Sequence, residues 1–264
     1  YEVRLFAVKP GRFRDARSYR DARLIDLPMR SRLDRRPGRR VARMVRDEHY
    51  EMLHAHTPRS LVVASPAARQ TGVPLVYHVH SPASRDSTRP LANLANQWTE
   101  RRLARQAARL IAVSPSVRQH MLALGFAAEQ VTCIPNGVPV IDATPRTQVP
   151  ERWTLGMFAL FRPRKGVEVL LDALARLRDQ GFQVCLRAVG PFETPKYEAE
   201  VRSLAQRLKL DDAIEWTGFV HDVRAELAQI DVSVLPSLFG EGLPMTVLES
   251  MAAGVPVVAS GVEG

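Results

Sequence analysis

Cysteine is scarce in this sequence of 264 residues, and long apolar runs are missing. The two cysteines, Cys133 and Cys185, lie in separate strand-like segments without the spacing of metal ligands. We therefore interpret them as buried, reduced thiols of a cytoplasmic protein. No apolar run approaches the ~20 residues that a membrane-spanning helix needs, and no signal peptide is visible.

The two ends of the sequence limit what these absences exclude. The chain begins with Tyr1 rather than Met, and it stops at Gly264 just after an expected strand. We expect both ends to be truncated, so the missing targeting signals say little about the full-length protein.

Acidic residues are outnumbered by basic ones, and the net charge is +9. Such a charge can attract nucleic acid, anionic lipid or anionic substrates, although a solvated arginine-rich surface is the simpler interpretation. No aromatic residues alternate with the arginines, and no zinc-finger or RNA-recognition signature is present, so we do not expect nucleic acid as a partner. The arginines that crowd the first stretch are Arg12, Arg14, Arg17, Arg20, Arg23, Arg30, Arg32, Arg35, Arg36, Arg39, Arg40, Arg43 and Arg46.

Strand-like and helix-like segments alternate along the whole chain, which predicts an α/β fold with parallel sheets covered on both faces. We expect strands at about 3–8, 52–56, 75–79, 110–113, 131–134, 154–159, 182–188, 214–218, 231–236 and 256–259. We expect helices at about 41–45, 60–70, 91–108, 115–124, 167–177, 197–208 and 244–253. Three prolines and no apolar period mark 139–150 as a linker, so the expected domains are 1–143 and 144–264.

The segment from 231 to 259 has the pattern strand, tight loop, helix, strand. Two glycines flank Glu241, which allows the backbone to turn sharply and to approach a ligand closely. Pro244 suits the first turn of the helix, whose N-terminus offers unpaired N–H groups to an anion. Glu249 follows Glu241 by eight residues, about two helical turns. By itself this pair is more simply a loop glutamate and a solvated helix glutamate.

The surrounding residues make the pair more specific. Gly242, Leu243 and Pro244 follow the first glutamate, and the run from Glu249 to Ala259 follows the second. The whole string resembles the E-x7-E signature of retaining, family 4-type glycosyltransferases. The resemblance implies two Rossmann-like domains that face a cleft (the GT-B fold), and transfer of a sugar from a nucleotide diphosphate sugar to a hydroxyl acceptor. It also implies that Glu241 contacts the donor sugar, that Glu249 binds ribose, and that residues 242–244 hold donor hydroxyls or phosphate.

The loop after the expected strand 154–159 carries cations at the start of a helix, where they would neutralise a diphosphate. It resembles the diphosphate loop Gly-Arg-x-x-x-x-Lys-Gly of the same family, with Lys165 and Gly166 at its end. Ala159 and Leu160 stand where the family usually has Gly-Arg. We expect Lys165 to bind the diphosphate, and Arg162 or Arg164 to replace the missing arginine, with Arg162 preferred.

His80 ends a strand at a position where ligands bind in such folds. A lone histidine is more often structural, but the strand resembles the family's strand that ends in a histidine near the active site. We expect His80 to be catalytic, as a proton relay or a contact of the sugar or acceptor, and His78 to point elsewhere. His54 and His56 share one strand face, but no third zinc ligand is evident, so we expect no metal site.

Two further features complete the expectations. Gly190 looks like the family's loop beside the nucleotide base. Residues 98–109 form a basic helix with one tryptophan; it can help the protein sit on an anionic membrane surface, although a plain surface helix is more ordinary.

The expected donor is a UDP- or GDP-sugar, with no cofactor or metal, and the expected acceptor is a glycan or a lipid-linked glycan. We expect a cytoplasmic protein, peripheral at the inner face of the membrane, in polysaccharide or glycolipid assembly. The alternatives are a sugar-nucleotide-binding homologue without transfer activity, an epimerase or phosphorylase of the same fold, and a polyanion binder.

Overall fold

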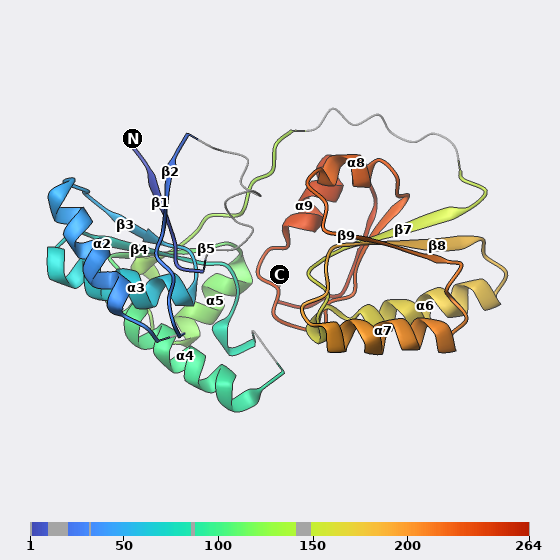
Figure 1. The fold of residues 1–264 in the computed structure, drawn as a ribbon, viewed down its shortest axis with the longest axis horizontal. Helices are drawn as coiled ribbons and strands as arrows, with labels where there is room; N and C mark the ends of the chain where they lie inside the picture. The colour runs from blue at the N-terminus through green and yellow to red at the C-terminus, as the bar shows by residue number, and fades with distance from the viewer. Residues whose placement is uncertain (1, 10–20, 32, 86–87, 141–148, 264) are drawn as a thin grey trace. The chain divides into compact units, whose positions relative to one another are not determined.

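The structure is a computed structural model that describes residues 2–9, 21–31, 33–85, 88–140 and 149–263. The chain divides into two compact units, Tyr1–Pro135 and Asn136–Gly264 (Figure 1). All ladders between the described strands are parallel, which confirms the predicted α/β class. Most of the predicted linker, residues 141–148, and four of the arginines noted above, within 10–20, lie outside the described residues, as does Arg32.

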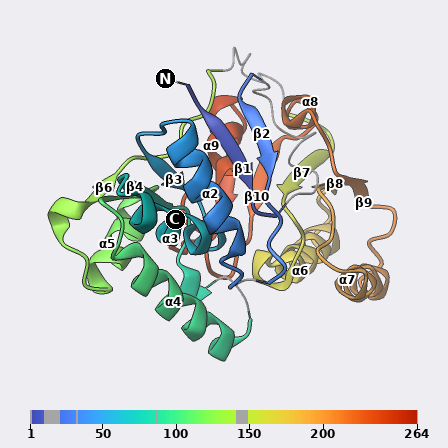
Figure 2. The ribbon, with the colours of Figure 1, turned by 60° about the vertical axis from the view of Figure 1, so that its left-hand side comes forward.

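The first unit contains two parallel sheets. Its strands are β1 (Arg4–Ala7), β2 (Arg23–Asp26), β3 (Leu53–Ala55), β4 (Leu75–Val79), β5 (Arg109–Ala112) and β6 (Val131–Cys133). The strands β3, β4, β5 and β6 pair in chain order, and β1 and β2 pair separately (Figure 2). The helices are α2 (Arg36–Asp47), α3 (Pro58–Thr71), α4 (Pro90–Ala104) and α5 (Pro115–Ala123), with the 3-10 turns η1 (Ala83–Arg85) and η2 (Ala128–Gln130).

Short capping sequences set the helix starts after β3 and β5. The Thr57 hydroxyl accepts the N–H of Ser60 at 3.1 Å, and Ser114 caps α5 in the same manner. Pro58 and Pro115 follow these caps, at positions where a missing N–H costs nothing. Because each cap lies two residues after the end of its strand, the chain leaves the carboxyl edge of the sheet and enters a helix within a few residues.

The second unit is built on one five-stranded sheet with the order β11-β10-β7-β8-β9. The strands are β7 (Trp153–Phe158), β8 (Val184–Val189), β9 (Ile214–Gly218), β10 (Val232–Leu235) and β11 (Val257–Ala259). The helices are α6 (Val167–Asp179), α7 (Pro195–Arg207), α8 (Val223–Leu227) and α9 (Met245–Ala252), with the 3-10 turn η3 (Pro163–Lys165).

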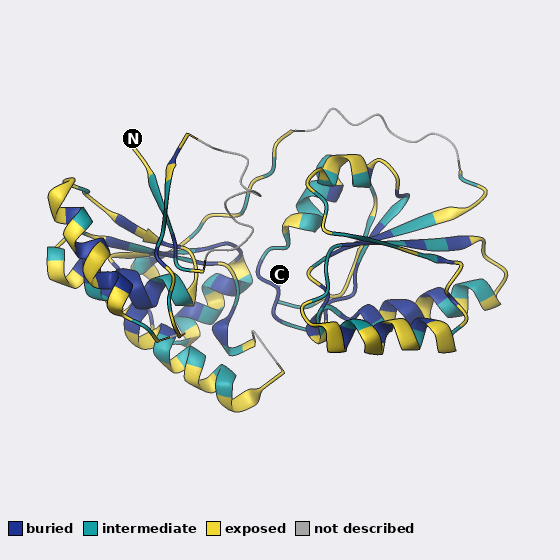
Figure 3. Cartoon of the chain, viewed as in Figure 1, coloured by how far each residue is buried: buried dark blue, intermediate teal, exposed yellow. Residues whose placement is uncertain are grey.

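Alternating residues of β7 and β8 supply two hydrophobic cores. Met157 and Leu186 belong to the larger cluster, together with residues of α6 and α7, whose buried sides are visible in Figure 3. Phe158 and Val189 belong to a second cluster with Leu227 of α8. The period of two residues along a strand explains this division, because neighbouring side chains point to opposite faces.

The region before β3 contains more regular structure than the sequence predicts. The strand β2 was not expected, and α2 begins five residues before the expected helix 41–45, with Pro37 and Gly38 in its first turn. Proline is compatible with the first helical turn because its missing N–H would be unpaired there. A Cβ at Gly38 would lie 2.9 Å from the carbonyl oxygen of Val63, so this glycine permits α2 to approach α3 closely.

The structure also bears on the expectations for the two cysteines and for membrane-spanning helices. Cys133 and Cys185 are free thiols, but both are half-buried rather than buried. Of the helices that the structure describes, none has the length and apolar character required to cross a bilayer.

A buried carboxyl group connects α4 to the central strand β4. The Tyr77 hydroxyl donates to Glu100 Oε1 at 2.5 Å, and the backbone N–H of Ala83 also bonds to Glu100. Burial raises the pKa of Glu100 from 4.5 to about 7, although both hydrogen bonds oppose the shift. Since the ionised form is disfavoured inside the protein, Glu100 should destabilise the fold as the pH rises.

This shift predicts the pH dependence of stability. Below pH 4.5 the carboxyl is neutral in both states, and ionisation through pH 7 then costs about 3 kcal/mol of folding free energy. Glu100→Gln keeps a neutral hydrogen-bonding group, so by pH 8 the variant should be more stable than the parent by about 1–3 kcal/mol. Urea denaturation from pH 5 to pH 8 measures this, with the exposed Glu200→Gln as control. If the stability difference between Glu100→Gln and the parent does not grow with pH, burial does not raise the pKa of Glu100.

Candidate donor site and histidine cluster

The order of the five-stranded sheet reverses between β7 and β10. These strands are neighbours, and Val232 is in register with Leu155, although 73 residues separate the end of β7 from the start of β10 in the chain. The β8–β9 side and the β11 side of the sheet are therefore built in opposite directions from this point. Ligands of open parallel sheets bind outside the carboxyl ends of strands at such a reversal. A ligand-binding site is therefore expected at the loops after β7 and β10.

The backbones of these two loops are in direct contact. Gly166 ends the β7 loop with φ 68°, and a Cβ there would lie 2.1 Å from the carbonyl oxygen of Pro236. The N–H of Leu238 donates to the carbonyl oxygen of Arg164 at 2.9 Å. Only glycine fits at position 166, because it combines a positive φ with this close approach.

Glu241 lies at the centre of the contact, with 6% of its surface exposed. Its Oε1 accepts hydrogen bonds from Lys165 Nζ and from the Ser237 hydroxyl, each at 2.5 Å. Arg164 Nη1 lies 3.5 Å from the same oxygen. Within the described residues Oε2 accepts no hydrogen bond. The two predicted residues Glu241 and Lys165, 76 positions apart, therefore form one buried cluster with a free oxygen.

Arg164 and Ser237 are the members of this cluster that sequence reasoning did not select. Arg164 Nη1 also donates to the carbonyl oxygens of Phe239 and Gly240, at 3.2 and 3.0 Å, and so holds the loop that precedes Glu241. Arg164 was named only as a second choice for the missing family arginine, and nothing in the local sequence distinguishes Ser237 from an ordinary loop serine.

The cluster keeps the glutamate ionised. Burial raises the pKa of Glu241, but the hydrogen bonds from Lys165 and Ser237 and the charges of Lys165 and Arg164 outweigh it, so the net pKa is below the ordinary value. The Glu241 carboxylate thus lies against two cationic side chains, Lys165 and Arg164, and a second carboxylate, Glu263, accepts the N–H of Gly240 in the same loop at 2.7 Å. Such a site suits an anionic group such as a phosphate.

Arg162, the preferred arginine of the prediction, is outside this cluster. Its Nη1 lies 3.7 Å from Glu193 Oε1, in the loop between β8 and α7. The structure therefore separates the three basic residues of the β7 loop: Lys165 and Arg164 contact Glu241, whereas Arg162 pairs with Glu193.

The residues after Glu241 lead into α9. Gly242 is buried, and of the two glycines that flank Glu241 only Gly240 has a positive φ, 77°. The Leu243 carbonyl oxygen accepts from Asn136 Nδ2 at 3.1 Å. Pro244 is the N-cap of α9 rather than a residue of its first turn, and no side chain caps the helix. The N–H groups of that first turn thus have no side-chain partner from the cap.

Glu249 is half-buried in α9, and burial raises its pKa. Within the described residues its side chain forms no hydrogen bond or ion pair. A carboxylate that is partly desolvated without a partner costs free energy, so this position is suited to accept hydrogen bonds from a ligand.

Gly190 ends β8 beside the β7 loop. Its φ is 132°, and a Cβ would lie 1.9 Å from the carbonyl oxygen of Ala159. Its N–H donates to the carbonyl oxygen of Gly218 at 2.8 Å. Gly190 therefore holds the loops after β7, β8 and β9 together.

The predicted residue His80 belongs to a group of four histidines in the first unit. His56 Nδ1 and His80 Nε2 are 3.2 Å apart, within hydrogen-bond distance. The ring centroids of His78 and His80 are 4.4 Å apart, and those of His54 and His56 are 4.2 Å apart. The expectation that His78 points away from His80 is wrong, because residues two apart on a strand share a face.

These four histidines are neutral at physiological pH. Burial lowers the pKa of His56 and of His78 to about 4, with a further contribution from the neighbouring histidines. The pKa values of His54 and His80 are lowered for the same reason. A neutral imidazole can accept a proton or bind a metal ion.

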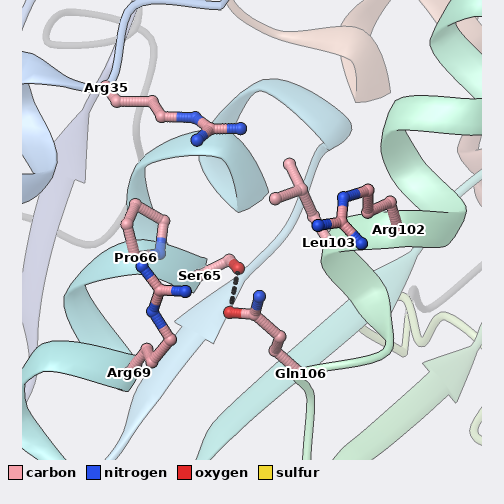
Figure 4. Close-up of a pocket in the computed structure, with 7 residues that line it drawn as sticks. All are labelled: Arg35, Ser65, Pro66, Arg69, Arg102, Leu103 and Gln106. Atoms are coloured by element: carbon pink, nitrogen blue, oxygen red, sulfur yellow. Dashed lines mark hydrogen bonds between the residues drawn. The ribbon is translucent and has the colours of Figure 1, made fainter.

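A cationic recess in the first unit was not anticipated. Arg35, Arg69 and Arg102 surround a hydrogen bond from the Ser65 hydroxyl to Gln106 Oε1, 2.7 Å long (Figure 4). None of the seven side chains that line it is acidic, and none was predicted as a site residue.

The fold and the Glu241 cluster define the class of the protein: it has the GT-B glycosyltransferase fold. The structure of Anabaena Alr3699/HepE in complex with UDP and glucose matches with a TM-score of 0.77 and 26% identity, over 91% of this chain and 68% of that one. Sucrose-phosphate synthase from Thermosynechococcus elongatus matches in fold, with a TM-score of 0.78 and 20% identity, over 99% of this chain and 71% of that one.

The family follows from the sequence. A family model described as Glycosyltransferase Family 4 matches residues 1–140, and one described as Glycosyl transferases group 1 matches residues 152–264. The chain belongs to the family 4 glycosyltransferases, as the E-x7-E string predicted.

Curated relatives include two kinds of mannosyltransferase. Phosphatidyl-myo-inositol mannosyltransferase of Mycobacterium leprae is 31% identical over 228 residues, which are 84% of this chain and 58% of that protein. MMP alpha-(1->4)-mannosyltransferase of Mycolicibacterium hassiacum is 29% identical over 236 residues, 84% of this chain and 56% of that protein. The chain thus spans less than two thirds of the length of these relatives.

The contact at Gly190 predicts a large effect of one methyl group. Gly190→Ala should destabilise the second unit by about 2–4 kcal/mol, because strain at positive φ adds to a backbone clash. Gly181→Ala is the matched control: its φ is 89°, but nothing lies within 4 Å of the added Cβ, so only the strain of about 1 kcal/mol applies. Thermal unfolding of both variants compares them, and equal losses would rule out the close approach as the cause.

Proposed function

We propose that this chain is the core of a retaining glycosyltransferase that moves a sugar from a nucleotide diphosphate sugar to a hydroxyl acceptor, in the assembly of polysaccharides or glycolipids. The observation that carries the proposal is the buried Glu241–Lys165 pair at the sheet reversal, with a free glutamate oxygen. The Anabaena structure, bound to UDP and glucose, and the mannosyltransferase relatives support the donor and acceptor classes.

The second unit would hold the donor. Lys165 would stabilise the diphosphate as negative charge develops on the leaving group. Arg162, which pairs with Glu193 of the loop after β8, would supply a second positive charge. The first N–H groups of α9, after Gly242, Leu243 and Pro244, would bind phosphate or sugar hydroxyls. Arg164 is occupied by the loop carbonyls, so its role is to position Glu241 rather than to bind phosphate.

The nucleoside would be held by the two remaining predicted residues. Glu249, half-buried and without a protein partner, would accept hydrogen bonds from the ribose hydroxyls. Gly190 would allow the base to approach the loop after β8, because it lacks a side chain there.

Glu241 would orient the donor sugar through its free Oε2 and stabilise the positive charge that develops on the ring. As the anomeric C–O bond to the diphosphate breaks, the leaving diphosphate would take the proton of the acceptor hydroxyl, and the new C–O bond would form on the same face. His80, whose pKa is lowered by burial, would contact the sugar or acceptor or relay a proton. These steps require no metal ion or cofactor.

We further propose that the protein works in the cytoplasm, at the inner face of a membrane that carries the acceptor. Trp98 is 64% exposed on α4 and lines a surface recess with Arg101, Arg102 and Arg105. An exposed aromatic side chain among arginines suits an anionic lipid surface.

Calorimetric titration with UDP and with GDP tests the donor site. One nucleotide should bind saturably, and Glu249→Ala should weaken it by about 10-fold to 100-fold, the usual loss for a hydrogen bond to a charged group. Glu200→Ala, an exposed helical glutamate of α7, should bind normally. Raising the salt concentration should have only a mild effect.

The alternatives give different results. The donor site would be overturned if neither nucleotide bound, or if nucleotide binding were unchanged in Glu249→Ala and disappeared at high salt. The second result would favour a polyanion-binding surface. If a nucleotide sugar binds, the anomeric configuration of the product with a glycan or glycolipid acceptor tests retention. Conversion of the donor sugar without an acceptor would indicate an epimerase, and binding without turnover a binding homologue.

A further inference from the structure

Three histidines of the first unit place their ring nitrogens together. His54, His56 and His78 each offer one nitrogen, and these atoms all lie within 4.8 Å of one another. His54 and His56 share a face of the β3 edge, and the parallel register of β3 with β4, continued by one residue, sets His56 beside His78. The arrangement follows from sheet geometry, so it does not depend on a flexible loop.

The histidine on the central strand lacks a partner. Both ring nitrogens of His78 are buried, and neither has a hydrogen-bond partner among the described residues. Leaving such a polar group buried and unpaired costs free energy. A hydrophobic residue would avoid that cost, so the position of His78 points to a ligand that satisfies its nitrogen.

We propose that His54, His56 and His78 bind one divalent transition-metal ion of the zinc class. Imidazole nitrogens suit zinc, copper and nickel, whereas magnesium and calcium prefer the oxygen ligands that this group lacks. Three protein ligands leave a fourth position open for water or another ligand, as in catalytic rather than structural zinc sites.

His80 completes the arrangement without being a ligand. His56 Nδ1 is paired with His80 Nε2, which leaves His56 Nε2 as the nitrogen available to a metal ion. Ligating histidines usually bond their second nitrogen to a neighbour, which fixes the tautomer and the ring orientation. The metal would therefore also fix His80, the predicted catalytic histidine, although the metal site itself does not rest on the proposed transfer reaction.

Zinc titration of an untagged, chelator-treated protein tests the proposal. One zinc ion should bind per chain with a Kd of about 1 μM or lower, and magnesium should not compete. His54→Ala and His78→Asn should each weaken zinc binding by at least about 10-fold. His221→Ala, an exposed histidine of the second unit, should bind zinc as the parent does. Cobalt substitution should give the visible absorption of a tetrahedral nitrogen-ligated ion.

Several results would overturn the site: no zinc binding at about 100 μM, or binding that is unchanged in both His54→Ala and His78→Asn. His54 is at the surface, so its variant should remain folded even if the His78 variant does not, and circular dichroism checks this. UDP and GDP titrations are repeated on zinc-free protein. If the parent protein binds a nucleotide but no zinc, only the metal site is rejected. If it binds zinc but neither nucleotide, only the donor site is rejected.

Discussion

The second unit depends on a carboxylate that is buried between two loops from different parts of the chain. Glu241 can be ionised inside the protein only because Lys165 and Ser237 donate to it and Arg164 lies beside it. An ion pair of this kind adds little net stability, because desolvation offsets the attraction, but removing one partner leaves an unpaired buried charge. The pair therefore fixes the geometry of the loops more than it strengthens the fold, and Gly166 allows the loops to come close enough for it to form.

The same constraint places chemistry at the sheet reversal. The loops after β7 and β10 must leave the sheet at its carboxyl edge, where they bring a lysine, an arginine and a serine around one carboxylate. The two cations of this cluster suit an anionic group, and the free oxygens of Glu241 and Glu249 can accept hydrogen bonds. In the first unit the reactive side chains are histidines. The parallel register of β3 and β4 brings them together, and burial favours the neutral form of His56.

The basic residues of the β7 loop have different partners. Ala159 and Leu160 stand where the resemblance places glycine and arginine, and this part of the loop is closely packed, because a Cβ at Gly190 would lie 1.9 Å from the carbonyl oxygen of Ala159. Arg164 donates to the carbonyl oxygens of Phe239 and Gly240, and Arg162 pairs with Glu193 in the loop after β8. The charge of the motif is thus retained, but one arginine supports the site and another is left nearer the surface.

The sequence by itself determined the alternation of strands and helices and the family, because these depend on local periodicity and a contiguous string. It did not predict β2, because a four-residue strand in a basic segment has no clear period. Only the tertiary structure decided that Arg164 rather than Arg162 contacts Glu241, and that His54, His56 and His78 meet. Contacts between distant loops and between neighbouring strands depend on strand order and register, which one-dimensional spacing does not specify.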